Sequence, residues 1–442
     1  MPRHATNPAS DTSAGSAALC AAFAPLPLEQ LARECGFLRR RPKKVLPRVF
    51  LQLCCLLTLQ TECSLRAWAC LWGLLTHQTL SKQALAKRCS ARALAFVRAV
   101  LQLVLGRLAR DAAEIPATLR AFGRVLLHDS TTLALAPKLA AAFPGPRNHC
   151  QQLYAALKIQ VVYDLLSQRC VHFALTPFTT NDQAASELIL GLARRGDLII
   201  RDLGYLVLRV LARAQEQGVF FLSRWRQGTA LWLPGQAQPL ALAAHLRQHG
   251  TWDGPVLLGL KDRLPARLIA LLLPPAVAAE RRRKAWANRD RRSRPCKERL
   301  ALLDWEIFIT NVPPALWSAQ EVAETYRLRW RIEILFKAWK SHFRLARFTN
   351  GSAAQIQLLV YGRLLWISLF QASFLPPCAL QQPLSILKLA AYCEEYLLLP
   401  LLALLAPTLT PEVLAAQIAY HCRAEKRGKP KPKLDYPFPK LS

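Results

Sequence analysis

Apolar residues change their spacing along the chain, and the changes divide it into segments. From 27 to 120 they recur every three or four positions, which is the spacing of amphipathic helices. From about 121 they fall into short runs separated by turn-like segments, which is typical of β-strands. After 315 the helical spacing returns. The pattern predicts a helical region, a mixed α/β region and a second helical region.

Within the α/β region the predicted order is three strands, a helix, a strand, a helix and a strand. This order is typical of a mixed α/β sheet. The predicted elements are strands at 123–135, 156–166 and 170–178, a helix at 181–196 that begins at an Asn/Asp cap, a strand at 197–205, a helix at 206–218 and a strand at 219–225. Residues 226–315 are irregular, with short strand candidates such as "GTALWLP" and "WEIFITNVP".

Composition and charge narrow the class of protein. The chain has 442 residues, of which 52% are hydrophobic, so a substantial core is expected. Its net charge of +31 requires a polyanionic partner, with nucleic acid the first candidate and an anionic membrane surface the second. The longest apolar runs, "VFLQLCCLLTL" and "YLLLPLLALLA", are shorter than the roughly 18 residues of a membrane span. They are expected to be buried helices.

The cysteines and the N-terminus indicate the compartment. Thirteen cysteines occur without any C-x-x-C spacing, which favours reduced thiols over disulfides or zinc ligands. Residues 1–20 lack the basic start and apolar stretch of a signal peptide. Frequent Ala, Leu and Arg are typical of a GC-rich bacterial gene. We therefore expect a protein of the bacterial cytoplasm, associated with the nucleoid.

Two acids stand at the ends of apolar strands, in a chain that has only 28 acidic residues. Asp129 follows "RVLL" and Asp202 follows "LII". Carboxylates at strand ends of an α/β sheet can converge on the crevice where such folds bind ligands. Each acid could instead cap a turn through its own side chain. Two rival positions, Asp164 and Asp197, are interpreted as structural.

A third acid lies in the stretch "YRLRWRIEILFKAWK" (326–340), which reads as a helix with one apolar face. At 100° per residue, four polar side chains project within an arc of roughly 60°: Tyr326, Arg329, Glu333 and Lys340. Such a set suits a phosphodiester, because a carboxylate can ligate Mg²⁺ while arginine and lysine hold phosphate oxygens. The alternative is a structural ion pair between Glu333 and Arg329.

These motifs resemble a known family. The spacing Tyr, two residues, Arg, three residues, Glu, six residues, Lys is the YREK signature of the insertion-sequence-four (IS4) family of DDE transposases, and residues 326, 329, 333 and 340 match it throughout. The residues of "RWRIEILFKAWK", and not only their spacing, are also similar to the corresponding helix of Tn-five type transposases. "HDSTT" resembles the family's first Asp context and "DLGY" its second, although "DLGY" has Leu where many members carry a basic residue. The resemblance runs from about 120 to 370.

The resemblance implies an α/β fold with a ribonuclease-H-like catalytic core and an inserted β-rich domain, preceded and followed by helical regions. The 131 residues from Asp202 to Glu333 leave room for the insertion. The expected segments are a flexible N-terminus (1–26), a helical DNA-binding domain (27–120), the first part of the core (121–225), the β-rich insertion with its basic segment (226–315), the second part of the core (316–370), a helical region for dimerisation (371–422) and a basic tail (423–442).

The resemblance also implies the chemistry. Asp129, Asp202 and Glu333 would ligate two Mg²⁺ or Mn²⁺ ions, one activating the attacking oxygen and the other stabilising the leaving oxygen. Tyr326, Arg329 and Lys340 would bind DNA phosphates. The chain would bind terminal inverted repeats as a homodimer, cleave the element ends and join the 3′-hydroxyl to target DNA.

Further DNA contacts are expected outside the three acids. Trp305 occupies the place where hairpin-forming relatives stack a tryptophan on a flipped base; a core tryptophan in a strand is the alternative. The segment 81–101 is expected to contact terminal-repeat DNA, although a solvated helix bundle fits its pattern equally. The segment 281–299, with ten basic and two acidic residues, is expected to contact the DNA backbone. The candidate contacts are Lys82, Lys87, Arg88, Arg92, Arg281, Arg282, Arg283 and Lys284.

Two other classes of protein are considered. One is a catalytically inactive DNA-binding transposase derivative that acts as an inhibitor or regulator, against which the three intact acids argue. The other is a peripheral membrane protein that uses its cationic segments. It is disfavoured because 281–299 has few apolar residues to insert into a bilayer.

Overall fold

The computed structural model describes residues 26–39, 45–57, 64–107, 117–147, 153–287, 296–345 and 351–379, together with 387, 390 and 391. The predicted flexible N-terminus as far as 25, the basic tail 423–442 and most of the predicted dimerisation region 371–422 lie outside the described residues.

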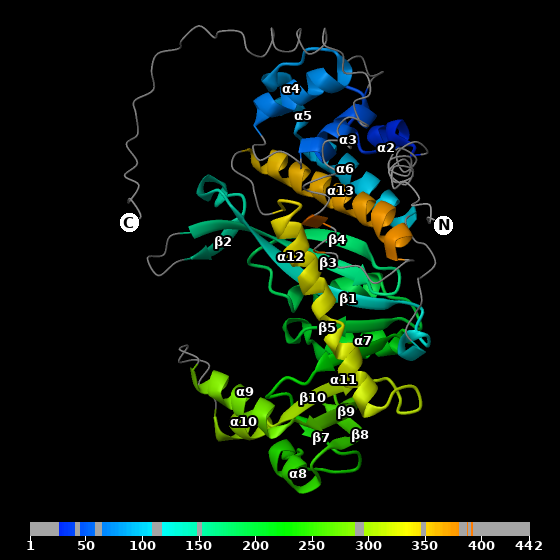
Figure 1. Ribbon diagram of the computed structural model, residues 1–442, viewed down its shortest axis with the longest axis vertical. Helices are drawn as coiled ribbons and strands as arrows, with labels where there is room; N and C mark the ends of the chain where they lie inside the picture. Colours follow the sequence, from blue (N-terminus) through cyan, green and yellow to red (C-terminus); the bar gives the residue numbers. More distant parts are fainter. Residues whose placement is uncertain are drawn as a thin grey trace, which may run out of the picture.

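Helices precede the sheet in the described part of the chain and pack against the last long helix (Figure 1). They are α2 (Leu28–Glu34), α3 (Pro47–Leu56), α4 (Leu65–Thr76), α5 (Lys82–Arg88) and α6 (Ala91–Arg107), and the last helix is α13 (Ala353–Ala379). Fully buried aromatic side chains such as Phe50, Trp68 and Phe96 fill the interior between them. Helix α13 crosses α3 closely at Gly362, where a Cβ would lie 2.5 Å from the carbonyl oxygen of Cys54.

A ten-stranded sheet forms the centre of the described structure, with strand order β2-β3-β1-β5-β6-β10-β9-β8-β7 and β4 paired with β3. Strands β1, β5 and β6 are parallel neighbours, and the other pairs are antiparallel. The first six strands are β1 (Val125–Leu135), β2 (Pro144–Arg147), β3 (Leu153–Asp164), β4 (Arg169–Pro177), β5 (Leu198–Arg201) and β6 (Phe220–Arg224). Helix α7 (Leu208–Glu216) connects β5 to β6. The mixed α/β prediction is confirmed.

Residues between β6 and α11 (Ala319–Arg327) add four more strands and three short helices. These are β7 (Leu231–Trp232), α8 (Leu242–His249), β8 (Trp252–Leu258), β9 (Leu264–Leu272), α9 (Pro275–Ala287), α10 (Lys297–Leu302) and β10 (Trp305–Thr310). Strand β10 pairs with β6, so these strands extend the central sheet. They share a hydrophobic cluster of their own, which includes Trp305, Ile309 and Leu268.

One predicted helix takes another form. The segment 181–196 begins at the expected cap, because Asn181 Oδ1 accepts a hydrogen bond from the Ala184 N–H at 2.7 Å. Its helical part is the 3₁₀ segment η5 (Ala184–Gly191). The Ser186 carbonyl there accepts a hydrogen bond from Arg201 Nη1 at 3.0 Å, so it is engaged by a side chain from β5. The predicted cap and helix are therefore confirmed in part: the helix is shorter than 181–196 and is of the 3₁₀ type.

No single helix in the described part of the chain is long and apolar enough to cross a bilayer. Helices α5 and α6 together have the length and apolar composition of a span, but the chain bends by 66° between them.

Candidate active site

Asp129 and Asp202 are brought together by the pairing of two parallel strands. His128 of β1 lies opposite Arg201 of β5, and each acid is the next residue along its strand. The carboxylates therefore lie side by side on the face of the sheet that α12 (Trp330–Ser341) covers (Figure 1). Asp202 begins the 3₁₀ turn η6 (Leu203–Tyr205) without a side-chain capping bond, so the turn-cap alternative is wrong there.

Glu333 reaches the same place from α12, through Arg329. The guanidinium of Arg329 lies between the acids: Nη2 is 2.6 Å from Glu333 Oε1 and Nη1 is 3.8 Å from Asp129 Oδ2. Asp202 is close enough to act on the charges of both Asp129 and Arg329. Three acids that are far apart in the sequence thus surround one cation. The Glu333–Arg329 ion pair of the alternative interpretation is present as well.

The helix that carries the motif is broken, which the sequence did not predict. Helix α11 (Ala319–Arg327) ends before α12 begins, and the N–H groups of Leu328, Arg329, Arg331 and Ile332 each bond to the carbonyl three residues earlier. This 3₁₀ joint turns the chain further per residue than an α-helix does. Tyr326 lies beside the site but is only 5% exposed: it packs on Phe308, and the guanidinium groups of Arg224 and Arg329 lie near its ring. Burial raises the pKa of its hydroxyl, and the charge of Asp202 also acts on it.

The electrostatics of the acids show crowded negative charge. The pKa of Asp129 is raised to about 6. Burial is the main cause and the charges of Asp202 and Glu333 add to it, while a hydrogen bond from the Ser130 N–H and the charge of Arg329 oppose the rise. Burial alone would lower the pKa of Arg329, but its hydrogen bond with Glu333 and the nearby negative charges raise it. A cation is therefore strongly favoured among these carboxylates.

The residue types fit a divalent metal, because carboxylate oxygens are hard ligands and a cation relieves their mutual repulsion. In the described structure no group of three His, Cys, Asp or Glu side chains is close enough to hold a metal ion as it stands. At this site the guanidinium of Arg329 separates Asp129 from Glu333. A metal ion held by both Asp129 and Glu333 would have to take the place of this guanidinium.

Two predicted residues lie away from the acids. Lys340 is half-buried at the far end of α12, and burial lowers its pKa. Trp305 is 7% exposed in the second hydrophobic cluster, and its indole N–H donates to the Gly250 carbonyl at 2.8 Å. The core-tryptophan alternative fits this placement, and base stacking by Trp305 does not.

The four predicted DNA contacts on α9 are all ion-paired. Arg283 and Lys284 pair with Glu280, at 2.7 and 3.4 Å. Arg282 pairs with Asp304. Arg281 lies 3.4 Å from Glu306.

The four predicted contacts on α5 and α6, at positions 82, 87, 88 and 92, are all exposed. Asp164 and Asp197 have structural roles as predicted: Asp164 accepts backbone hydrogen bonds from Val125 and Leu166, and Asp197 pairs with Arg124.

Sequence reasoning missed a polar layer on the opposite face of the sheet from the three acids. Arg201 is 3% exposed and donates to Ser186, and Tyr205 donates to Gln160 Oε1 at 2.6 Å. His128 is buried, its ring 4.3 Å from that of Tyr205. Alternation along the strands could have found this layer, because His128 and Arg201 each precede a candidate acid and so face the other way.

Two other residues carried weaker signals. Asp182 is a fourth carboxylate, and it accepts from Ser130 and Lys158, both at 3.1 Å, on the face of the sheet opposite to Asp129. It lies in a turn just before η5, within the segment predicted to be a helix. Trp330 follows Arg329 directly and is 60% exposed.

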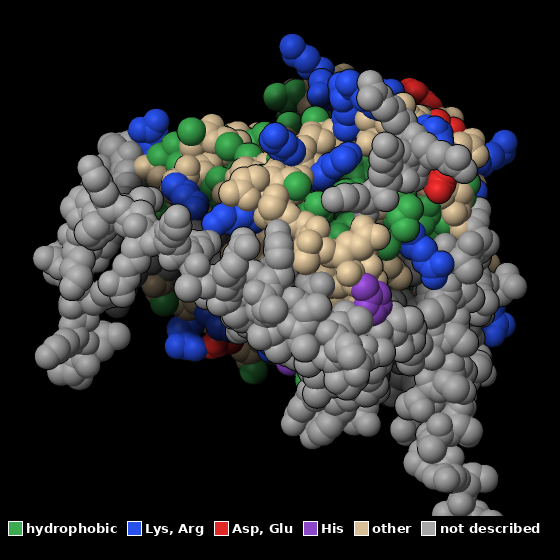
Figure 2. Space-filling view, turned by 90° about the horizontal axis from the view of Figure 1, so that it is seen from above, with side chains coloured by type: hydrophobic (Ala, Val, Ile, Leu, Met, Phe, Trp, Pro, Cys, Tyr) green, Lys and Arg blue, Asp and Glu red, His purple; other side chains and the backbone are tan. Residues whose placement is uncertain are grey.

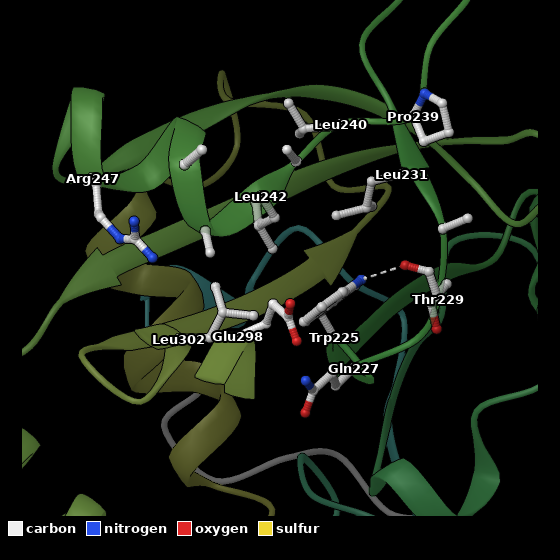
Figure 3. A pocket seen from close by; sticks show the side chains of 14 residues that line it. Trp225, Gln227, Thr229, Leu231, Pro239, Leu240, Leu242, Arg247, Glu298 and Leu302 are labelled. Atoms are coloured by element: carbon white, nitrogen blue, oxygen red, sulfur yellow. Dashed lines mark hydrogen bonds between the residues drawn. The ribbon is translucent and has the colours of Figure 1, made fainter. Parts of the chain in front are cut away.

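A separate cavity of about 380 Å³ opens in the added region, between α8, α10 and β7 (Figure 3). Mostly apolar side chains line it, together with Arg247 and Glu298, and the Trp225 indole N–H donates to the Thr229 carbonyl at its edge. None of the candidate site residues lines this cavity.

Comparison with known proteins identifies the family of the chain. The model of the family described as "Transposase DDE domain" matches residues 120–369, more than half of the chain. The chain belongs to this family. It is a DNA transposase, an enzyme that cleaves DNA and transfers its strands with the help of divalent metal ions.

Relatives of this transposase support the assignment. It is 28% identical over 376 residues to the transposase for insertion sequence element IS231B of Bacillus thuringiensis subsp. berliner, covering 79% of this chain and 77% of that one. It is 25% identical over 319 residues to the transposase for IS1151 of Clostridium perfringens, covering 66% of each chain. A solved piggyBac transposase synaptic complex with hairpin DNA aligns with a TM-score of 0.48 at 10% identity over 94% of this chain and 87% of that one, a likeness too distant to build on.

Proposed function

We propose that Asp129, Asp202 and Glu333 are the catalytic acids of this transposase and that they hold two Mg²⁺ or Mn²⁺ ions. The observation that carries the proposal is their convergence around Arg329 from β1, the end of β5 and α12. Ions bound there supply the activation of an attacking oxygen and the charge stabilisation of a leaving oxygen.

Arg329 has two positions in this proposal. Without metal it neutralises the acids, through its contacts with Glu333 and Asp129. With metal bound, its guanidinium is released toward solvent and binds a phosphate of the DNA, for which its fork geometry is suited. The 3₁₀ joint before α12 supports this motion, because such joints within helices often act as hinges. Lys340 contacts the DNA further along α12, and the Tyr326 hydroxyl bonds to a phosphate once the joint moves.

The finer family assignment belongs to the same proposal. The YREK spacing supports membership of the insertion-sequence-four family and similarity to Tn-five type transposases. The sheet supports a ribonuclease-H-like core, because an antiparallel set of β1, β3 and β4 adjoins β5 and β6, which run parallel to β1. Residues 226–315 would be the insertion, and the segment boundaries given by the sequence are kept. The enzyme would act as a homodimer on terminal repeats in the bacterial nucleoid.

Cleavage by a matched pair of variants tests the proposal. Glu333→Gln removes one acid charge from α12, and Glu324→Gln removes one from an exposed position on α11. The substrate is a DNA fragment with the ends of the element that encodes the chain, incubated with Mg²⁺. We expect Glu333→Gln to lose cleavage by a factor on the order of 100 or more, since a metal supplies several kcal/mol, while Glu324→Gln cleaves normally. Equal cleavage by both variants would refute the proposal. No cleavage by the unaltered protein, with DNA binding intact, would favour the inhibitor alternative.

A further inference from the structure

Arg201 is a buried cation in a chain whose cations are mostly on the surface. Figure 2 shows Lys and Arg side chains spread over the face in view, whereas Arg201 is 3% exposed. It forms no ion pair in the described part of the chain, unlike the buried Arg267, which pairs with Asp253 at 2.6 Å. Burial lowers the pKa of Arg201 to about 10, so the side chain stays charged at neutral pH. A buried charge without a counter-ion is unfavourable, so stability alone does not explain this residue.

The side-chain hydrogen bonds of Arg201 all go to one serine. Its Nη1 donates to the Ser186 hydroxyl at 2.7 Å and to the Ser186 carbonyl at 3.0 Å. The Ser186 hydroxyl in turn donates to the Tyr205 carbonyl at 3.0 Å, and Ser186 is fully buried. Arg201 directly precedes Asp202, and Tyr205 ends the turn η6 that follows it. One serine therefore holds both ends of the segment that carries Asp202.

The turn η6 is also held at two further points. The Tyr205 hydroxyl donates to Gln160 Oε1 of β3 at 2.6 Å. The Leu203 carbonyl accepts a hydrogen bond from Arg226. The Asp202 side chain itself makes no capping hydrogen bond. The place of its carboxylate is therefore set by the backbone that these neighbours hold.

Asp182 links the same turn to the strand of the first acid. A Cβ at Gly204 would lie 3.2 Å from Asp182 Oδ2, so the turn packs directly on this carboxylate. Asp182 also accepts from the hydroxyl of Ser130, the residue after Asp129. The backbones that carry the two acids are thus connected behind the sheet, on the side away from their carboxylates.

We propose that Arg201 and Ser186 are positioning residues for Asp202. They hold η6 so that the Asp202 carboxylate is presented to the metal ions with no hydrogen bond of its own to break. The proposal rests on the proposed function, in which Asp202 is a metal ligand. Partners that fix a ligand from behind raise metal affinity because the ligand need not be ordered on binding.

A pair of variants that each lose a buried hydroxyl tests the proposal. Ser186→Ala removes the link between the two ends of the segment. Thr310→Val is the control, because the fully buried Thr310 hydroxyl donates to the Phe221 carbonyl at 2.6 Å. Mn²⁺ binding is measured by electron paramagnetic resonance on the full-length chain in complex with DNA that carries the element ends. We expect Ser186→Ala to weaken Mn²⁺ binding by about 10-fold and Thr310→Val to change it by less than about 2-fold.

A second pair at Arg201 decides the question if Ser186→Ala does not fold. Arg201→Lys keeps a donor for Ser186, since a single nitrogen makes both bonds. Arg201→Met removes the donor together with the buried charge. We expect Arg201→Lys to stay within about 3-fold of the unaltered Mn²⁺ affinity and Arg201→Met to lose about 10-fold. The melting temperature of Arg201→Met should not fall, because an apolar side chain replaces a buried charge.

Amide hydrogen exchange in the presence of EDTA reads the turn without any metal. The N–H groups of Tyr205 and Leu206 bond to the carbonyls of Asp202 and Leu203 at 3.0 and 3.2 Å, so their exchange reports whether η6 is held. Ser186→Ala should speed this exchange by about 5-fold, which corresponds to one net hydrogen bond. Thr310→Val should leave it unchanged.

Asp202→Asn separates the failure of this proposal from that of the proposed function. The positioning role is overturned if Asp202→Asn loses Mn²⁺ while Ser186→Ala binds it as Thr310→Val does, or while Arg201→Met binds it as Arg201→Lys does. Unchanged exchange of the turn in Ser186→Ala would also overturn it. If Asp202→Asn itself binds Mn²⁺ normally, the metal site of the proposed function is wrong and the positioning role fails with it.

Discussion

The corner of α5 and α6 and the helix α9 carry similar clusters of cations, but the structure uses them differently. On α9 all four cations pair with carboxylates, two of which, Asp304 and Glu306, come from the loop before β10 and from β10 itself. Around α5 and α6 the sequence offers no acid from 63 to 110. A run of like charges in a sequence therefore does not by itself mark a DNA-binding surface, because the fold can bring acids that pair with it.

Arg329 stands between these two cases. It is ion-paired like the cations of α9, yet its partners are the acids that a metal ion would take over. In the proposed function its charge becomes available to DNA only when a metal ion replaces it, which would couple metal binding to phosphate binding at one side chain.

The largest effect is expected from neutralising pairs of neighbouring cations in the two regions. Lys87→Gln with Arg88→Gln should weaken binding to duplex DNA by about 100-fold at low salt, since each charged phosphate contact contributes roughly 1.5 kcal/mol. Arg283→Gln with Lys284→Gln should change it by less than about 3-fold, because Glu280 already neutralises that pair. Fluorescence anisotropy over a salt series measures both. Equal losses would remove the contrast between the regions.

An effect of about tenfold per pH unit is expected for metal binding at the acids. Because the pKa of Asp129 is raised to about 6, the protonated form competes with metal below that pH, and metal affinity rises as the pH increases through 6. Removing the cation with Arg329→Met should raise the pKa of Asp129 further, since the positive charge now lowers it. Titration with Mn²⁺ between pH 5 and 8 should show the midpoint at a higher pH in the variant. A midpoint that stays or falls would show that Arg329 does not act on Asp129.

A gain of a few-fold is expected from releasing the cations of α9. Glu280→Gln removes the partner of both Arg283 and Lys284, so their charges become available to phosphates. Non-specific duplex DNA should bind about 2- to 5-fold more tightly, with a steeper dependence on salt. Glu324→Gln, on α11, is the control for the change in net charge. Equal gains in the two variants would mean that total charge, not local pairing, sets the affinity.

The smallest effect is expected on stability. Glu306→Gln breaks ion pairs with Arg224 and Arg281, at 2.6 and 3.4 Å, and should lower the free energy of unfolding by about 1 kcal/mol because the arginines are partly exposed. Lys87→Gln should leave that free energy unchanged, since the lysine is exposed and its stretch of the sequence, 63–110, has no acid. Chemical denaturation compares the two. A larger loss from Lys87→Gln would assign a structural role to the corner's cations.

Much of the α/β order was predictable from the sequence, because alternation and short apolar runs mark the strands directly. The sequence placed both acids at strand ends, which is correct for Asp202 after β5 but not for Asp129, which lies within β1. Their approach follows from the parallel pairing of β1 with β5. Glu333 was identified as a candidate because it matches the Glu of the YREK signature. Its contact with Arg329 was already one of the two interpretations of that helix.

Other features could not be predicted, because they depend on contacts between distant segments. The 3₁₀ joint at Leu328 leaves no mark in the apolar pattern, and neither does the burial of Tyr326 beside it. The ion pairs of α9 require Asp304 and Glu306, which are brought near only when β10 joins the sheet. The sequence fitted Trp305 equally well as a core residue and as a base-stacking residue, and only its burial in the fold distinguishes the two.

Counting bound Mn²⁺ by electron paramagnetic resonance tests the role of the three acids most directly. The protein is titrated in complex with DNA that carries the element ends, and Asp202→Asn is compared with the unaltered chain. The expected result is two ions for the unaltered protein and a loss of at least one, or of most of the affinity, for Asp202→Asn, with DNA still bound. The same number of ions at the same affinity in both proteins would contradict the assignment of Asp202, and with it the proposed metal site.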